Sequence, residues 1–327
     1  MTTDRIQIRE LRKHFPYKSA WYVKEKQSVK AVDGVTFDIP VGETFGLVGE
    51  SGCGKSTVGK MIVRLIEPTS GSVLIDGEDI LQLPKSALKG FRRNVQIVFQ
   101  DPFGALDPNM RVGEIVAEPF ITHEKLLRNE WEDKVADLLE LVGLDPENTM
   151  HRFPHEFSGG QRQRINIARS IALHPKFIVC DEAVSALDVS VQAQILNLLK
   201  DLQKKLGLTY LFISHNLGVI RHLSSVVGVM YLGKIVETAP VDSLFASYRH
   251  PYTEALMTVI PVIRESDEHV KVLLPDEIPD PMNLPSGCRF HPRCPYCCEQ
   301  CKREEPPLTE IEPGWFIACH HPLQRRG

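Results

Sequence analysis

Residues 49–57, which read Gly-Glu-Ser-Gly-Cys-Gly-Lys-Ser-Thr, constrain the fold of this chain more than any other stretch. They follow the apolar run 44–48 and precede a helix-compatible run, 58–65. Glycines allow consecutive backbone N–H groups to curl around an anion, and the start of the next helix adds partial positive charge. Lys55 can reach the terminal phosphates of a nucleotide, and Ser56 can hold Mg²⁺. The spacing therefore predicts a phosphate-binding loop between a strand and a helix.

The loop also sets expectations for individual side chains. Cys53 lies beside Lys55 at a helix N-terminus, where a thiolate is favoured, so we expect this cysteine to be reactive. Cys180, in an apolar run, is expected to be an inert buried residue. The residues expected to contact the nucleotide in this loop are Gly49, Ser51, Gly52, Cys53, Gly54, Lys55, Ser56 and Thr57.

Length and composition indicate a soluble globular protein. A chain of 327 residues suggests about two domains, and 43% apolar with 24% charged residues is ordinary for this class. The 42 acidic residues slightly exceed the 38 basic ones, so no nucleic-acid partner is expected. The N-terminus leads into no apolar signal region, and no run of 18 apolar residues occurs, so we expect neither secretion nor membrane spanning.

The N-terminal region is expected to form strands, and a later insert to form helices. Residues 6–48 alternate apolar and polar side chains in short runs, which predicts an antiparallel sheet leading into the glycine-loop strand. An insert between Phe15 and Val29 carries aromatic residues that suit either a solvated hairpin tip or stacking on adenine. Helical spacing and the stop at Gly143 predict a mostly helical insert over residues 104–166.

Polar side chains follow the remaining apolar runs. A strand at 95–99 delivers Gln100, which can coordinate Mg²⁺ or orient a water. The buried strand 177–180 ends in Asp181 and Glu182, at the sheet edge where ligands bind in open α/β folds. Asp181 can hold Mg²⁺ and Glu182 can polarise an attacking water, and the strand 210–213 is followed by His215.

A second glycine-containing helix start lies at the end of the helical insert. Ser158 suits an N-cap, and two glycines then expose backbone N–H groups, which predicts a second phosphate cradle without its own lysine. Its residues are Ser158, Gly159, Gly160 and Gln161.

This series of motifs, in this order, resembles the nucleotide-binding subunit of ABC transporters over residues 5 to about 250. The flanks resemble the dipeptide/oligopeptide importer family, specifically its F-type ATP-binding subunit; they include Gln100-Asp101-Pro102-Phe103 and the run 181–190. The segments His250-Pro251-Tyr252-Thr253 and 285–295 are similar to that family's C-terminal segment. The resemblance implies an α/β fold with a RecA-like P-loop NTPase core, an antiparallel β subdomain, a helical insert and a small Cys- and Pro-rich C-terminal segment.

The resemblance implies a shared ATP site between two subunits. The glycine loop and Asp181 of one subunit and the signature, residues 158–161, of the other are expected to enclose one ATP. Glu182 is expected to be the general base and His215 to contact the γ-phosphate and hold that base in place. Gln100 is expected to contact Mg²⁺ and report nucleotide state to the helical insert.

Two further contacts and the domain bounds follow from the same resemblance. Phe15, or Tyr17 behind it, is expected to stack on adenine, and Asp188 is expected to lie at the shared site. The nucleotide-binding domain is expected at 1–250 and the C-terminal segment at 251–327, and loss of a metal cluster from that segment is expected to leave ATP binding unaffected. The implied partners are a paralogous ATP-binding subunit, two transmembrane permeases and an extracytoplasmic peptide-binding protein, with this chain peripheral on the cytoplasmic face of the membrane.

The C-terminal segment holds six of the chain's eight cysteines. Four of them, spaced as in the family's tail, imply a [4Fe-4S] cluster, and they are Cys288, Cys294, Cys301 and Cys319. Four thiolates suit zinc equally well by ligand chemistry. The additional Cys297 and Cys298 create two C-x-x-C pairs, so the ligand set stays open.

Other functions of the same machinery also stay open. An importer of nickel or a sugar would carry the same ATPase motifs, because the cargo is chosen by the binding protein and permeases. A soluble ABC ATPase of DNA repair or translation is disfavoured, because this chain has one glycine loop and a compact helical insert.

Overall fold

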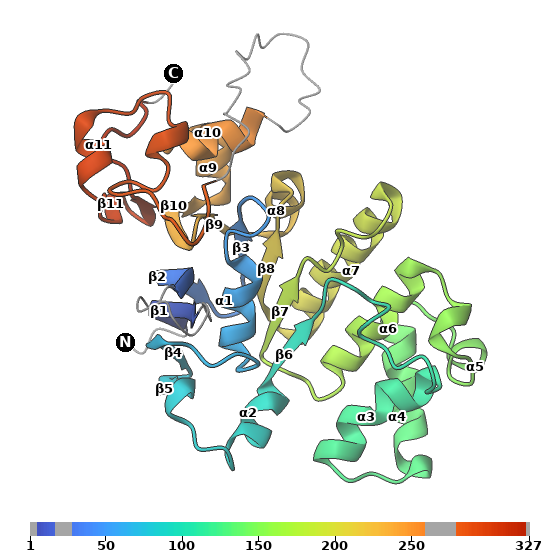
Figure 1. Ribbon diagram of the computed structural model, residues 1–327. Helices are drawn as coiled ribbons and strands as arrows, with labels where there is room; N and C mark the ends of the chain where they lie inside the picture. The colour runs from blue at the N-terminus through green and yellow to red at the C-terminus, as the bar shows by residue number, and fades with distance from the viewer. Residues whose placement is uncertain (1–4, 17–27, 259–278, 325–327) are drawn as a thin grey trace, which may run out of the picture. The chain divides into compact units, whose positions relative to one another are not determined.

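The computed structural model describes residues 5–16, 28–258 and 279–324, which fall into two compact units (Figure 1). The first unit combines residues 1–38, 45–81 and 214–327, and the second combines 39–44 and 82–213. The glycine loop and the cysteine-rich C-terminal segment therefore belong to the same unit. The aromatic residues Tyr17, Trp21 and Tyr22 of the insert lie outside the described residues.

Two groups of strands build the first unit. One has the order β2-β1-β4-β5, with β1 antiparallel to β4, and the other has the order β11-β12-β10-β9-β3. In the second group, β3 runs parallel to β9, while β10 is antiparallel to both β9 and β12. The strands are β1 (Arg5–Pro16), β2 (Ser28–Pro40), β3 (Thr44–Val48), β4 (Ser70–Ile75), β5 (Glu78–Asp79), β9 (Val226–Tyr231), β10 (Lys234–Pro240), β11 (Thr309–Glu312) and β12 (Trp315–Ile317).

Short helices complete this unit, and three of them belong to its C-terminal part near β10 (Figure 1). The helix after the glycine loop begins at Lys55, three residues before the predicted run, because Gly54 ends the loop in a left-handed conformation. The helices are α1 (Lys55–Ile62), η1 (Ile80–Gln82), α8 (Leu217–Leu223), α9 (Val241–Ala246), α10 (Pro251–Thr258), η3 (His291–Arg293) and α11 (Glu299–Arg303).

A parallel three-stranded arrangement, in the order β8-β7-β6, forms the centre of the second unit. The strands are β6 (Val95–Val98), β7 (Phe177–Asp181) and β8 (Thr209–Ser214). Every residue of β7 and β8 is buried, as expected for parallel strands covered on both faces. The register pairs Asp181 with Ile213, which places the acidic end of β7 at the carboxyl edge.

Helices surround these strands in the second unit (Figure 1). The helical character predicted for 104–166 is found in α3 to α6. The predicted stops are present, since Gly143 follows α4 with φ 73° and Gly207 caps α7 with φ 66°. The helices are α2 (Leu88–Asn94), α3 (Val112–His123), α4 (Arg128–Leu141), α5 (Pro146–Thr149), η2 (Pro154–Glu156), α6 (Gly159–Ile171) and α7 (Val189–Leu206).

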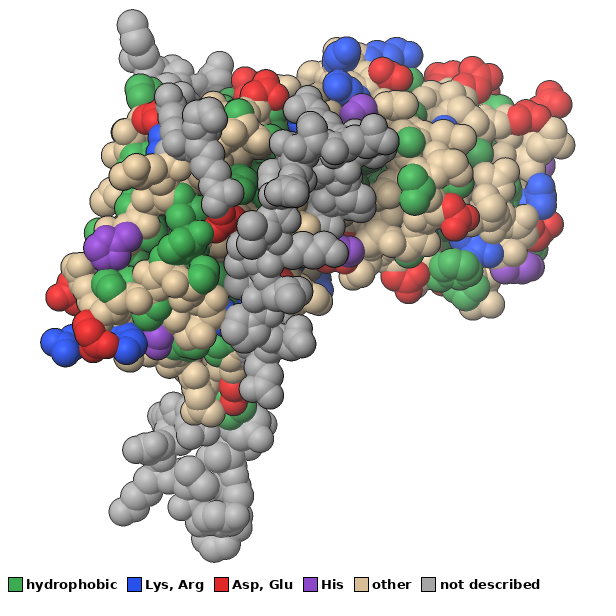
Figure 2. All heavy atoms as spheres, turned by 90° about the horizontal axis from the view of Figure 1, so that it is seen from above, with side chains coloured by type: hydrophobic (Ala, Val, Ile, Leu, Met, Phe, Trp, Pro, Cys, Tyr) green, Lys and Arg blue, Asp and Glu red, His purple; other side chains and the backbone are tan. Residues whose placement is uncertain are grey.

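The described surface is mixed in character. Figure 2 shows acidic and basic side chains interspersed on one face of the molecule, with apolar side chains between them. Among residues 5–16, 28–258 and 279–324, no helix has the length and apolar character needed to span a bilayer.

Candidate functional site

The glycine loop follows β3, whose five residues are all buried. Gly54 has φ 107°, and a Cβ there would lie 2.1 Å from the carbonyl oxygen of Ala31. A Cβ at Gly49 would lie 2.1 Å from the carbonyl oxygen of Met230. Real Cβ atoms do not approach backbone so closely, so only glycine allows the loop to curl at these two positions.

Lys55 lies inside this loop, with 4% of its surface exposed. Its ammonium donates hydrogen bonds to the carbonyl oxygens of Gly49, at 2.8 Å, and Glu50, at 2.9 Å. The N-cap of α1 is Gly54, which has no side chain to occupy the helix N–H groups. The loop therefore gathers a buried cation and an uncapped helix N-terminus, the combination that binds phosphate.

Cys53 does not have the reactive character predicted for it. The side chain is 4% exposed, and burial raises the pKa of its thiol more than the neighbouring Lys55 lowers it. The prediction of a favoured thiolate was wrong because the loop buries the sulfur, and low polarity disfavours the charged form. Cys180 is buried in β7 as predicted, and burial raises its pKa as well.

The predicted adenine-stacking residue lies near the end of β1. The ring of Phe15 is 38% exposed, and the ammonium of Lys13 lies 5.0 Å from its centroid. An exposed ring flanked by a cation can accept a planar base on its free area. Tyr17, the alternative, lies outside the described residues.

In the second unit, the structure brings together two of the predicted catalytic residues. Nε2 of Gln100 donates a 2.8 Å hydrogen bond to Oε2 of Glu182. Glu182 follows the buried Asp181 and has φ 49°, a left-handed conformation that costs a non-glycine residue energy. Its backbone N–H donates to the carbonyl of Ile213 at 3.0 Å, which holds the turn. The carboxylate is thus fixed in direction at the end of β7.

The signature residues begin α6, also in the second unit. Ser158 is the N-cap: its hydroxyl accepts from the Gln161 N–H at 3.4 Å, and its own N–H donates to Gln161 Oε1 at 3.0 Å. A Cβ at Gly160 would lie 2.4 Å from Cγ1 of Val191, so α6 packs closely on the first turn of α7. Asp188, the predicted shared-site residue, is the N-cap of α7, and the structure therefore places it next to the signature.

His215 belongs to the first unit, immediately after β8. It is exposed and precedes Asn216, whose side chain caps α8 by accepting from the N–H groups of Gly218 and Val219. The predicted residues are thus divided between units: the glycine loop, Phe15 and His215 lie in the first unit. Gln100, residues 181–182, Asp188 and the signature lie in the second.

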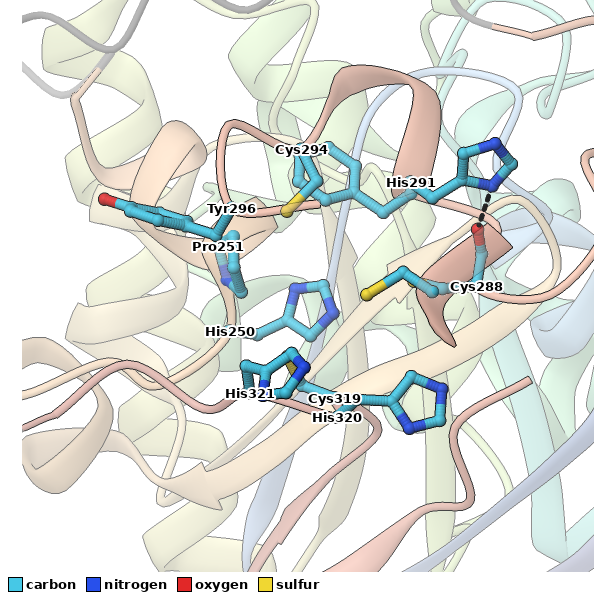
Figure 3. A pocket seen from close by; sticks show the side chains of 11 residues that line it. His250, Pro251, Cys288, His291, Cys294, Tyr296, Cys319, His320 and His321 are labelled. Carbon is cyan, nitrogen blue, oxygen red and sulfur yellow. Dashed lines mark hydrogen bonds between the residues drawn. The ribbon is translucent and has the colours of Figure 1, made fainter. Parts of the chain in front are cut away.

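The four cysteines predicted to bind a cluster line one pocket of the C-terminal segment. They are Cys288, Cys294, Cys301 and Cys319. Figure 3 shows the sulfurs of Cys288 and Cys294 turned toward the same space. Cys297 and Cys298 are not part of this lining; Cys298 Sγ instead lies 3.6 Å from Cys301 Sγ and 3.2 Å from Nε2 of His321.

The arrangement of the side chains in this pocket bears on metal binding. In the part of the chain that the structure describes, no group of three or more His, Cys, Asp or Glu side chains is arranged around a single metal ion. Four thiols are ligands of the type that both iron–sulfur clusters and zinc take. Their arrangement among the described residues favours neither metal over the other.

Sequence reasoning missed the contacts that the C-terminal segment makes with the glycine loop. The guanidinium of Arg293 forms two hydrogen bonds with the carboxylate of Glu50, at 2.8 and 2.9 Å. The Tyr252 hydroxyl accepts a hydrogen bond from the Glu50 N–H at 2.9 Å. The only signal in the sequence was an acid inside a phosphate-binding loop, where an unpaired negative charge would be unfavourable.

Comparison with protein families matches two parts of the chain. Residues 32–185 match the model described as ABC transporter. Residues 236–301 match the model described as oligopeptide/dipeptide transporter, C-terminal region.

Curated relatives match along nearly the whole chain. A probable peptide ABC transporter ATP-binding protein of Sinorhizobium fredii is 49% identical over 98% of this chain and 90% of its own length. The oligopeptide transport ATP-binding protein AppF of Bacillus subtilis is 49% identical over 96% of both chains. The di/tripeptide transport ATP-binding protein DppF of Pseudomonas aeruginosa is 44% identical over 98% of this chain and 99% of its own.

Solved structures match the fold of the ATP-binding part. A dimeric bacterial ABC transporter cassette has a TM-score of 0.64 and 29% identity, covering 72% of this chain and 98% of its own. A dimeric post-hydrolysis state of an ATP-binding cassette, bound to ADP and Pi, has a TM-score of 0.63 and 29% identity over 72% of this chain and 98% of its own.

Proposed function

Because the chain belongs to the ATP-binding proteins of peptide ABC transporters, we propose that it hydrolyses ATP to power uptake of di- or oligopeptides. One observation carries this proposal. Residues 32–185 match the ATPase family, and residues 236–301 of the same chain match the C-terminal region of oligopeptide/dipeptide transporters. The ATPase match identifies the reaction, and the C-terminal match favours a peptide cargo over nickel or a sugar.

The residues assigned to this reaction fall into two groups, those that bind ATP and Mg²⁺ and those that act in hydrolysis. The backbone N–H groups of residues 49–57 and the ammonium of Lys55 would hold the phosphates, while Phe15 would stack on adenine. Bound Mg²⁺ would neutralise phosphate charge, and Ser56, Gln100 and Asp181 would hold it. The 2.8 Å hydrogen bond from Gln100 to Glu182 also directs the Glu182 carboxylate.

The hydrolytic step needs a base directed at a water. Glu182 would accept the proton of the attacking water, and His215 would contact the γ-phosphate. The strained φ of 49° at Glu182 supports a catalytic role, because unfavourable backbone conformations persist where the surrounding structure holds a side chain for chemistry.

We further propose that two ATP-binding subunits dock head to tail, so that Ser158, Gly159, Gly160, Gln161 and Asp188 close the ATP site of the other subunit. The partner would be a paralogous subunit, and the pair would bind two permeases at the cytoplasmic face of the membrane, supplied by an extracytoplasmic peptide-binding protein. Ser158→Arg tests this arrangement. The variant is expected to bind ATP normally as an isolated chain but not to form the closed dimer. Loss of ATP binding by the isolated variant would contradict it.

For the C-terminal pocket we propose a [4Fe-4S] cluster held by Cys288, Cys294, Cys301 and Cys319. Protein purified without oxygen is expected to be brown and to contain about four irons and four labile sulfides per chain. Cys288→Ser should remove the colour and Cys297→Ser should not. Colourless protein with one zinc that depends on Cys297 and Cys298 would instead support a zinc site.

The cargo is tested by uptake into vesicles that contain the chain, its two permeases and its binding protein. A labelled tripeptide should accumulate only with ATP, and the accumulation should stop in Glu182→Gln. Nickel and a disaccharide serve as matched cargo controls in the same vesicles. Accumulation of either control in place of the tripeptide would overturn the peptide assignment while leaving the ATPase assignment in place.

A further inference from the structure

The C-terminal segment reaches the glycine loop through one residue, Glu50. Its carboxylate receives two hydrogen bonds from Arg293, and its N–H donates to the Tyr252 hydroxyl. Its carbonyl oxygen accepts from the Lys55 ammonium at 2.9 Å and from the Cys53 N–H at 3.3 Å. Glu50 therefore connects the C-terminal segment to the lysine of the glycine loop.

The Arg293–Glu50 pair is shielded from water. The side chain of Arg293 is 5% exposed and that of Glu50 25% exposed. The guanidinium of Arg293 also lies 5.8 Å from the centroid of the Tyr231 ring, which packs against Tyr252 and Phe290. A two-pronged arginine–carboxylate pair in such surroundings is strong and fixes direction as well as distance.

The charge of Glu50 gives this pair a role beyond packing. A carboxylate in a loop that receives the phosphates of a nucleotide would repel them, and the repulsion is stronger where water is scarce. Arg293 neutralises that carboxylate and holds it through two hydrogen bonds. The arginine also limits where the Glu50 carbonyl, and with it the Lys55 ammonium, can lie.

A second arginine of the same segment supports the loop from its other side. Arg289 forms a buried ion pair with Asp33 of β2. The Asp33 N–H donates to the Gly233 carbonyl at 2.9 Å, and the Gly233 N–H donates to the Cys53 carbonyl at 2.9 Å. The segment that runs from Cys288 to Cys294 thus contacts the structure around the glycine loop at two places.

We propose that Arg293 and Tyr252 are positioning residues for the nucleotide: they hold Glu50 so that the glycine loop keeps its phosphate-binding form. The C-terminal segment thereby sets nucleotide affinity. The inference rests on the proposed role of the glycine loop as the ATP site.

The test measures the Kd of MgATP and MgADP for the full chain by isothermal titration calorimetry. Arg293→Met keeps an unbranched apolar side chain but removes the guanidinium and its charge. It should weaken the binding of both nucleotides about tenfold, as expected for loss of a charge-assisted pair. Glu50→Ala should weaken binding less than Arg293→Met does, because it removes the repelling carboxylate together with the pair. The double variant should bind no more weakly than Arg293→Met, because both substitutions remove the same interaction.

Conservative variants and a matched control separate positioning from general stability. Arg293→Lys, which keeps the charge but not the two-pronged geometry, should weaken binding only about threefold, and Tyr252→Phe about as much. Arg249→Met is the control, because Arg249 pairs with Glu312 at 3.2 Å and packs on Trp315 without contacting the loop. Its Kd should stay within about twofold of wild type.

Three outcomes decide the matter. Additive losses in the double variant, or a normal Kd in Arg293→Met with only a lowered unfolding temperature, would overturn the positioning role. Lys55→Ala, titrated in the same experiment, must abolish nucleotide binding. If Lys55→Ala binds nucleotide normally, the glycine loop is not the ATP site, and the proposed function fails rather than the positioning role. If Arg293→Met does not fold or loses bound iron, Glu50→Ala and Tyr252→Phe decide the question, because both lie outside the cysteine-containing stretch.

Discussion

Two helices of this protein start beside glycines, α1 after Gly54 and α6 at Gly159, and their N-termini are built in opposite ways. α1 follows Gly54, which offers no capping side chain, so the first N–H groups of α1 face the glycine loop. α6 follows Ser158, whose hydroxyl accepts from the Gln161 N–H while Gln161 accepts in return. No side chain caps the start of α1, whereas at the start of α6 the Ser158 hydroxyl and the Gln161 side chain each accept a hydrogen bond from one backbone N–H.

The glycines themselves differ in the same sense. Gly49 and Gly54 are required because backbone carbonyls occupy the space that a Cβ would need. At Gly160, the space that a Cβ would need is occupied only by a methyl group of the Val191 side chain, which can rotate. The difference teaches that backbone contacts fix the glycine loop within its own unit, while the start of α6 is fixed by its own capping side chains and can accommodate a methyl group at Gly160.

The largest expected effect comes from a substitution that alters neither helix start and removes only the general base for hydrolysis. Glu182→Gln should lower the turnover of ATP about 100-fold or more, because loss of a general base removes the acceptor of the water's proton. ATP binding should stay normal, since neither glycine-containing turn is altered. Steady-state ATP hydrolysis by the assembled transporter measures the turnover, and equilibrium binding measures the ATP affinity. Glu147→Gln on α5 is the control, and wild-type turnover in Glu182→Gln would show that another group is the base.

A second prediction tests the two kinds of glycine directly. Gly54→Ala should weaken MgATP binding about tenfold or more, because the residue has φ 107° and its Cβ would overlap a backbone carbonyl. Gly160→Ala, the matched variant, should leave the isolated chain's ATP affinity unchanged, since Val191 can give way. Calorimetric titration of both variants measures the contrast. Equal losses would mean that the two turns are not built differently.

Much of the fold and of each half-site could be predicted from the sequence, because those parts depend on local rules. The glycine spacing predicts the loop, the capping pair Ser158 and Gln161 predicts the start of α6, and buried runs predict β7 and β8. Where the sequence misled, the cause was burial. Nothing near Cys53 in the sequence shows that the loop encloses its sulfur.

The contacts of Glu50 were equally hidden, because they join residues far apart in the chain. Arg293 and Glu50 are 243 positions apart, and no periodicity or spacing connects them. The C-terminal segment carries few aliphatic residues, so the sequence indicated a separate appendage. Two buried arginines pair with residues in and around the glycine loop, and the rings of Tyr252 and Phe290 pack against Tyr231, so ion pairs and apolar packing together attach it.

A third prediction uses cysteine chemistry to compare the loop with the strands. Since burial raises the pKa of Cys53, a maleimide at pH 7.5 should modify it at least about tenfold more slowly than an exposed peptide cysteine. A raised pKa also means that the labelling rate should keep increasing as the pH passes 9.0, the usual value. Peptide mass mapping separates Cys53 from the tail cysteines. Fast labelling at neutral pH would show that the loop opens readily.

Cys180 is the matched buried control for that experiment. It lies within β7, so it should react only when the second unit unfolds, whereas Cys53 can react through local opening of the loop. MgATP should slow the labelling of Cys53 further and leave that of Cys180 unchanged. The same dependence on nucleotide at both cysteines would mean that labelling reports global unfolding in each case.

The smallest expected effect concerns the cap of α6. The hydrogen bond from the Gln161 N–H to the Ser158 hydroxyl is long, at 3.4 Å, so Ser158→Ala should lower the free energy of unfolding by only about 0.5–1 kcal/mol. Amide exchange at Gln161 should become about two- to fivefold faster, which corresponds to that range of free energy. Threonine restores an oxygen acceptor, so Ser158→Thr should bring exchange back toward the wild-type rate.

The same exchange measurement completes the comparison of the two helix starts. In the isolated wild-type chain, MgATP should protect the first amides of α1, because the phosphates supply the acceptors that Gly54 cannot. It should leave Gln161 unchanged, because Ser158 already satisfies that N–H. Protection of Gln161 by MgATP in the monomer would show that the signature belongs to the chain's own nucleotide. If the signature instead binds the ATP of another subunit, protection of the Gln161 amide should appear only in the closed dimer of Glu182→Gln.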